Sequence, residues 1–219
     1  MLTVSRDVRE RFKDLDIKYK VIKDVNVKPY NEDLEDLKRE VIQEVMETYS
    51  LETLKDRETF KAYRRFFWMI GIDPTKIRPA AEALIRRILR GKGIPRINTL
   101  VDAYNLASIK TEIALAAFDL GRLEETLTLR FGRGGEEFRG IGMKEPMRLK
   151  GGEVVISSGE KVIAVYPYRD SEETKITSKT REVMIVACGV PGINMFRLEN
   201  AIQLSCRFIL RFCGGHVVR

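Results

Sequence analysis

The 219-residue sequence contains a single histidine and only three cysteines, and this scarcity excludes several kinds of site. His216 lies three residues from the end, so a Ser-His-Asp triad or a histidine-rich zinc centre has almost no raw material. Cys188, Cys206 and Cys213 form no Cys-x-x-Cys pair and are expected to be free, buried thiols. Cys213 and His216 would supply only two of the four ligands that a zinc site needs. We therefore expect no metal and no cofactor.

Long hydrophobic runs are also lacking. The longest, such as residues 183–188, are far too short to cross a bilayer. The start of the sequence is charged and lacks the apolar stretch that a secretion signal contains. We therefore expect a cytoplasmic protein without a membrane partner. The formal net charge of +7 favours a polyanionic partner, although basic surfaces also occur in proteins that bind no nucleic acid.

The spacing of apolar residues predicts helices mainly in the first half and strands in the second. Helices are expected at about 32–50, 58–70, 79–90, 100–113 and 195–212. Strands are expected at about 19–27, 113–118, 127–131, 153–157, 162–166 and 183–187, the last of them central because it is apolar on both faces. The fold class is therefore α+β, with N-terminal helices, a mainly antiparallel or mixed β-sheet body and a C-terminal helix.

Residues 78–96 form the most basic segment, with six cations and one acid, Glu82. The candidate RNA-binding residues in it are Arg78, Arg86, Arg87, Arg90, Lys92 and Arg96. Contacts to a nucleic-acid backbone need cations without sequence readout, so a phosphate-facing patch is one interpretation. A solvated helix face is the other.

The glycine-rich stretch "GRGGEEFRG", residues 132–140, follows one expected strand and precedes another short one. It matches neither GxxxxGK[ST] nor GxGxxG, so a phosphate-binding loop is not indicated. We expect a hairpin turn there.

Two stretches carry a family resemblance. "INTLVDAYNLASIKTEIALAAFDLGRL", residues 97–123, and "GEKVIAVYPYRDSEETKITSKTREVMIVACGV", residues 159–190, resemble the B3/B4 module of the phenylalanyl-tRNA synthetase β-subunit. Asp102, Asn105 and the Ala-Phe-Asp-Leu run match in the first, and a repeated threonine rhythm matches in the second. The sequence is even more similar to free-standing B3/B4 domain proteins, over about residues 60–215.

The resemblance implies sheets and helices around a pocket and a role in tRNA quality control. In the synthetase this module hydrolyses tyrosine wrongly attached to the phenylalanine tRNA, and the other synthetase modules would not fit into 219 residues. We expect residues 1–58 to form a strand and helix extension packed on a B3/B4-like domain of residues 59–219.

Departures from the family pattern put the tyrosine specificity in doubt. Ala116 replaces a pocket histidine, Val186 replaces a glutamate, and Tyr-Pro-Tyr-Arg-Asp-Ser, residues 166–171, replaces a glycine-rich wall. Asn105 is the one matching polar pocket residue.

The replaced wall suggests a rebuilt polar pocket. The candidate catalytic residues are Asp170, Ser171 and Lys110, and the candidate substrate-binding residues are Asn105, Tyr168, Arg169 and Thr174. The guanidinium of Arg169 suits a carboxylate or phosphate, and Asp170 suits an α-ammonium or a water. Lys110 would stabilise an oxyanion. The competing interpretation is that Ser171 and Thr174 only cap turns and that Arg169 and Asp170 only make local salt bridges.

These observations predict a stand-alone tRNA-binding domain that hydrolyses mischarged aminoacyl-tRNA in trans. An aminoacyl ester is already activated, so holding a water and stabilising the oxyanion would suffice. The alternative is a non-catalytic module that binds RNA or a small amino-acid-like ligand, so enzymatic activity stays open. A third interpretation is that the basic charge serves only solubility.

Overall fold

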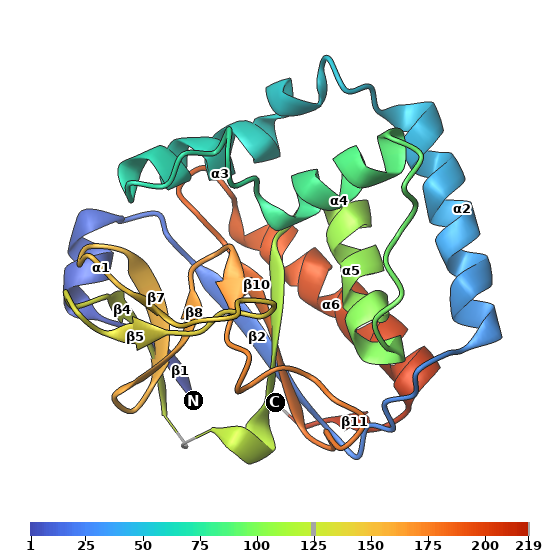
Figure 1. Cartoon of the computed structure of the whole chain (residues 1–219). Helices are drawn as coiled ribbons and strands as arrows, with labels where there is room; N and C mark the ends of the chain where they lie inside the picture. Colours follow the sequence, from blue (N-terminus) through green and yellow to red (C-terminus); the bar gives the residue numbers. More distant parts are fainter. Residues whose placement is uncertain (124–125, 219) are drawn as a thin grey trace.

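The computed structural model describes residues 1–123 and 126–218, in which a helical half covers one side of a strand-rich half (Figure 1). The helices are α1 (Arg6–Arg11), α2 (Glu32–Thr48), α3 (Glu58–Met69), α4 (Ala80–Leu89), α5 (Thr99–Thr111) and α6 (Met195–Cys213), with 3-10 turns η1 (Leu54–Asp56) and η2 (Leu120–Arg122). Asparagine side chains cap three of the helices: Asn31, Asn98 and Asn194 accept backbone N–H groups at the starts of α2, α5 and α6.

Most of the strands belong to one of two main sheets. One has the order β11-β2-β10-β3, made of β2 (Ile17–Lys23), β3 (Leu115–Asp119), β10 (Val183–Cys188) and β11 (His216–Val217). The other has the order β1-β4-β7-β8-β9, made of β1 (Leu2–Val4), β4 (Leu127–Phe131), β7 (Val154–Ser158), β8 (Lys161–Val165) and β9 (Arg169–Asp170). A small ribbon pairs β5 (Glu137–Phe138) with β6 (Met147–Arg148).

The α+β prediction is confirmed, and so is the central position of β10. This strand is buried along its whole length and pairs with β2 on one side and β3 on the other. Helices α5 and α6 pack together, and α6 lies against β2 and β10. The strand is apolar on both faces because both faces are covered.

The N-terminal residues contribute to both sheets. β2 lies between β10 and β11, while β1 pairs in parallel with β4 at the edge of the other sheet. Neither β1 nor α1 was expected from the sequence, since both are too short to show an apolar period.

The predicted glycine-rich hairpin is wrong. Strand β4 pairs with β7, and β5 pairs with β6, so residues 132–136 connect two sheets rather than two neighbouring strands. Turn composition marks a change of direction, but it does not identify the partner of the strand that follows.

The aromatic face of α3 forms core, as its spacing predicts: Phe60, Tyr63 and Phe67 are fully buried. The three cysteines are free and buried, also as predicted. Among residues 1–123 and 126–218, no helix combines the length and the apolar character of a membrane span.

Candidate functional site

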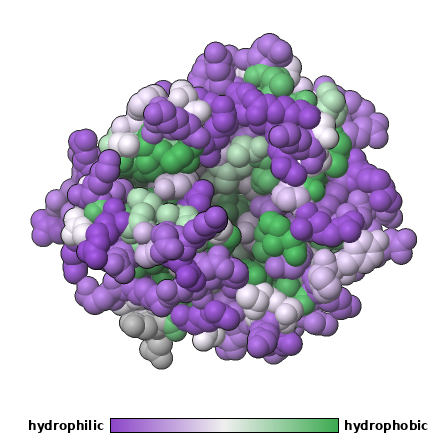
Figure 2. Space-filling view, viewed as in Figure 1, coloured by the Kyte–Doolittle hydropathy of each residue, from purple (hydrophilic) through white to green (hydrophobic). Residues whose placement is uncertain are grey.

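A small cavity of about 160 Å³ lies where β9 and the end of β8 approach α5. Its polar lining is Tyr104 and Asn105 from α5 and Asp170 from β9, with Tyr168 at one side. The rest is apolar: Leu115, Ala116, Ile156, Ala164, Val165 and Cys188 are among the wall residues. We call this cavity the Asp170 pocket. Figure 2 shows this face of the molecule hollowed near its middle, with hydrophobic residues inside and hydrophilic ones around much of the rim.

Asp170 is the only acid in the lining of this pocket, and it makes no ion pair within the described part of the chain. Burial raises the pKa of Asp170 from 3.8 to about 7, and a hydrogen bond from the Ala117 backbone opposes this only in part. Burial, and then the charge of Asp170, raise the pKa of Tyr104 above its usual value. Asp170 can therefore accept or release a proton near neutral pH.

Two buried tyrosines fix the segments around the pocket. The Tyr166 hydroxyl donates to the Gly189 carbonyl at 2.5 Å, and the Tyr63 hydroxyl donates to the Cys188 carbonyl at 2.6 Å. Tyr63 also accepts from the backbone N–H of Ala114 at 3.0 Å. The first tyrosine of the Tyr-Pro-Tyr sequence is thus an anchor that also lines the Asp170 pocket, as does the second, Tyr168.

The pocket wall reflects the departures from the family pattern. Ala116 lines it and is directly opposite Val186 across the β3–β10 pairing. Where the synthetase pattern has a histidine, the wall here has the apolar Ala116, and its glutamate is replaced by the buried Val186 opposite. Asp170 supplies the acid from a different strand.

A second cavity, of about 460 Å³, adjoins this pocket and shares Tyr168 with it. We call it the basic groove; its lining is Lys76, Ile77, Arg78, Ala83, Arg86, Arg87, Arg90, Lys92, Tyr168 and Arg169. The fold thus brings five of the six candidate RNA-binding residues together with Arg169. Arg96 lies elsewhere, paired with Glu35 at 2.8 Å and stacked over the Tyr30 ring.

The positive charge of the basic groove is mostly uncompensated. Arg86 is paired with the buried Glu82 at 2.8 Å, and Arg64 is paired with the same carboxylate. The other cations have no carboxylate within salt-bridge distance among the described residues; they are Lys76, Arg78, Arg87, Arg90, Lys92 and Arg169. The Nε of Arg78 is buried without a hydrogen-bond partner in that same set of residues. Such a groove attracts anions.

Four of the predicted catalytic and substrate-binding residues do not reach the Asp170 pocket: Arg169, which lines the basic groove, and Lys110, Ser171 and Thr174. Lys110 forms an ion pair with Glu44 and follows Asn105 by five residues, which rotates it by about 140° around α5. Ser171 is buried and accepts the backbone N–H of Glu173, and it neighbours Asp170 on an extended segment, where side chains alternate. Thr174 is buried, and its backbone carbonyl accepts from Asp119.

Tyr104 and Lys76 were not identified from the sequence. Tyr104 directly precedes the candidate Asn105 on α5, and adjacent helical residues differ by only about 100° in direction. Lys76 lies two residues before the start of the basic segment. Proximity in sequence to a candidate was the available signal in both cases.

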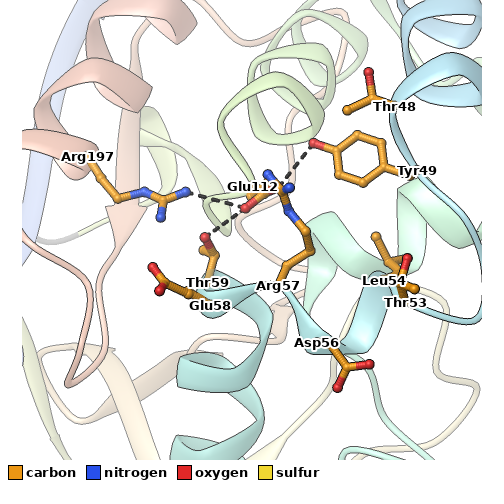
Figure 3. Close-up of a pocket in the computed structure, with 10 residues that line it drawn as sticks. All are labelled: Thr48, Tyr49, Thr53, Leu54, Asp56, Arg57, Glu58, Thr59, Glu112 and Arg197. Carbon is orange, nitrogen blue, oxygen red and sulfur yellow. Dashed lines mark hydrogen bonds and ion pairs between the residues drawn. The ribbon is translucent and has the colours of Figure 1, made fainter.

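A separate cavity of about 530 Å³ surrounds Glu112 (Figure 3). The Glu112 carboxylate accepts from the hydroxyls of Tyr49 at 3.1 Å and Thr59 at 2.7 Å, and from Arg57 at 2.8 Å and Arg197 at 3.3 Å. Figure 3 shows these four side chains converging from different segments. Because the carboxylate is already fully hydrogen-bonded, we interpret it as a structural cross-link.

Comparisons with known proteins agree with the resemblance found in the sequence. The family model described as "B3/4 domain" matches residues 62–214. The phenylalanine–tRNA ligase β subunit of Thermotoga maritima is 30% identical over 124 residues, which are 56% of this chain and 16% of that protein. The subunit of Fusobacterium nucleatum is 28% identical over 200 residues, covering 81% of this chain and 25% of that protein.

A solved structure shows the same fold. An N-terminal fragment of the phenylalanyl-tRNA synthetase β-subunit from Pyrococcus horikoshii matches with a TM-score of 0.53 at 12% identity, covering 99% of this chain and 50% of that chain. The chain therefore spans a quarter or less of the two ligase subunits and half of this fragment.

Proposed function

Because the chain belongs to the B3/4 domain family, we propose that it binds tRNA and hydrolyses wrongly charged aminoacyl-tRNA esters in trans. One observation carries the proposal: a groove of uncompensated cations opens beside a small pocket that contains a lone acid, Asp170. The groove suits the phosphates at the acceptor end of a tRNA, and the pocket suits the attached amino acid.

The proposed chemistry is a direct attack by water. The carboxylate of Asp170 removes a proton from a water molecule, and the resulting hydroxide adds to the ester carbonyl. The amide of Asn105 donates to the tetrahedral oxyanion. Collapse breaks the bond to the ribose oxygen, which takes the proton back from Asp170. The products are a free amino acid and an uncharged tRNA.

Arg169 is assigned to a phosphate rather than to a carboxylate. An esterified amino acid has no free carboxylate, and Arg169 lines the basic groove rather than the Asp170 pocket. Tyr168 separates the two cavities. The proposal assigns no catalytic step to Lys110, Ser171 or Thr174.

The test is release of amino acid from a panel of correctly and wrongly charged tRNAs. We expect selective release by the wild type, and loss of release in Asp170→Asn with tRNA affinity retained. Asp14→Asn, an exposed acid near α1, is the matched control and should keep full activity. Arg169→Ala should weaken the affinity for tRNA.

A non-catalytic module that binds RNA or an amino-acid-like ligand is the second candidate. The replacement of the family pattern's histidine by Ala116 in the pocket wall, and of its glutamate by Val186 opposite Ala116, favours it. Tight tRNA binding without release of any amino acid would establish this alternative.

A further inference from the structure

A third cavity, of about 410 Å³, continues from the basic groove, with which it shares Lys76, Ile77 and Tyr168. It lies between residues 70–77 and residues 147–153. Its apolar lining is Ile70, Ile72, Ile77, Met147, Leu149 and Val165, and we call it the apolar groove. Its volume is in the range of ligand-binding pockets.

Tyr168 borders all three cavities. Its ring is half-buried and packs edge-on against Phe67, with ring centroids 6.3 Å apart. An aromatic ring held in this way presents a fixed surface to whatever occupies the grooves beside it. The ring therefore lies where a chain passing from the basic groove would meet apolar surface.

The rim of the apolar groove carries two acids, Asp73 and Glu153, and two lysines, Lys76 and Lys150, so its formal charges balance. Asp73 accepts the backbone N–H of Thr75 at 2.9 Å, and Glu153 accepts that of Lys150, also at 2.9 Å, so both carboxylates are used locally. Neither Lys76 nor Lys150 has a salt-bridge partner among residues 1–123 and 126–218. The attraction for an anionic chain therefore comes from the neighbouring basic groove rather than from this rim.

We propose that the apolar groove binds a nucleobase of a single-stranded RNA segment whose phosphates lie in the basic groove. This inference deepens the proposed function and rests on its tRNA-binding part. Proteins that bind single strands combine a cationic track with aromatic side chains that contact the bases. Unpaired bases can be turned out of the strand into such sites.

A nucleobase fits these observations better than an apolar peptide segment. A peptide would fill the apolar groove alone, and the six uncompensated cations beside it would contribute nothing. Only a ligand that alternates flat apolar groups with negative charges uses both grooves and the aromatic ring at their junction.

The experiment compares two fluorescently labelled probes by anisotropy: a short single-stranded RNA ending in CCA, and the same backbone with its last three bases removed. For the wild type we expect the intact RNA to bind at least about fivefold more tightly, as stacking of a single base provides. Tyr168→Leu and Ile77→Ala should weaken binding of the intact RNA only. Ile97→Ala, at an exposed isoleucine outside the grooves, is the control.

The outcomes separate this inference from the proposed function. Equal, salt-dependent affinity for both probes would overturn base binding and leave the phosphate contacts standing. Binding of neither probe would overturn both. Base preference that persists in the two variants would overturn the assignment to this groove. The assignment would also be overturned if the groove bound an apolar peptide and no RNA base. Ile77 is 37% exposed, so its alanine variant is expected to fold even if Tyr168→Leu does not.

Discussion

The Thr180 hydroxyl donates a hydrogen bond to Asp119 Oδ2 at 2.7 Å across 61 residues of sequence. This contact joins the two stretches that resemble the synthetase module. Asp119 Oδ1 also accepts the backbone N–H of Gly121 at 3.1 Å. Neither Asp119 nor Thr180 lines the Asp170 pocket. The threonine-rich segment between β9 and β10 is therefore mainly a structural tie to the end of β3.

Replacing Thr180 by valine should lower stability and leave activity intact. The variant keeps the shape of the side chain but removes a buried donor to a buried carboxylate, which should cost about 1–3 kcal/mol. Denaturant titration measures this loss, and Thr48→Val, at an exposed position of α2, is the matched control. An unchanged free energy of unfolding would show that the contact is dispensable.

Asp170→Asn should change stability in a pH-dependent way. Below pH 3.8 Asp170 is protonated in both states; between 3.8 and about 7 the unfolded chain releases this proton while the folded chain keeps it. The wild type therefore loses stability as the pH rises through that window, and the asparagine variant does not. Above pH 7 we expect the variant to be the more stable, by about 1–3 kcal/mol.

The rate of amino acid release should also depend on the protonation of Asp170. Deprotonation of Asp170 lowers stability but should raise this rate. A general base acts only when it is deprotonated, so release by the wild type should rise with pH and reach half of its plateau near pH 7. Stopped reactions over a pH series measure this midpoint. A midpoint near 4, the usual range of an aspartate, would contradict the assignment of Asp170 as the base.

Arg87→Ala and Arg90→Ala should each weaken tRNA binding and its dependence on salt. Each lost phosphate contact should reduce the slope of log affinity against log salt by about 0.7 to 1. Arg9→Ala on α1 removes an exposed arginine that also lacks a salt bridge within the described residues, and it should leave the slope unchanged. If all three variants kept the slope of the wild type, the basic segment would be only a solvated helix face.

The fold was largely predictable because its elements are long and periodic. The stripe of Phe60, Tyr63 and Phe67 and the doubly buried β10 left little ambiguity, since burial on one or both faces leaves a direct pattern in the sequence. The pairing of β4 with β7 could not be predicted, because pairing depends on contacts between distant segments. The helix rotation that removes Lys110 from the pocket follows from spacing alone and was predictable.

The candidate site was only partly predictable. Asn105 and Asp170 were identified as separate candidates, but their meeting with Tyr104 depends on how α5 packs beside β9. The basic groove was visible as a run of cations, whereas its continuity with Arg169 was not. Glu112 gave no signal, since its four partners come from three segments far apart in the sequence.

Glu112→Gln should destabilise the fold without affecting the two grooves. The amide would lose the charge that Arg57 and Arg197 share, and its NH₂ group would face donors such as the Thr59 hydroxyl. Breaking a buried, hydrogen-bonded ion pair costs about 3–5 kcal/mol, and the half-exposed Arg57 reduces the expected loss to about 2–4 kcal/mol.

Glu58→Gln is the matched control, because Glu58 lines the same cavity but is exposed and makes no salt bridge within the described residues. It should change the free energy of unfolding by no more than about 0.5 kcal/mol. No residue lines both this cavity and the basic groove, so tRNA affinity measured well below the unfolding temperature should stay the same in both variants. A loss of affinity in Glu112→Gln alone, with stability unchanged, would mean that the Glu112 cavity itself contacts the RNA.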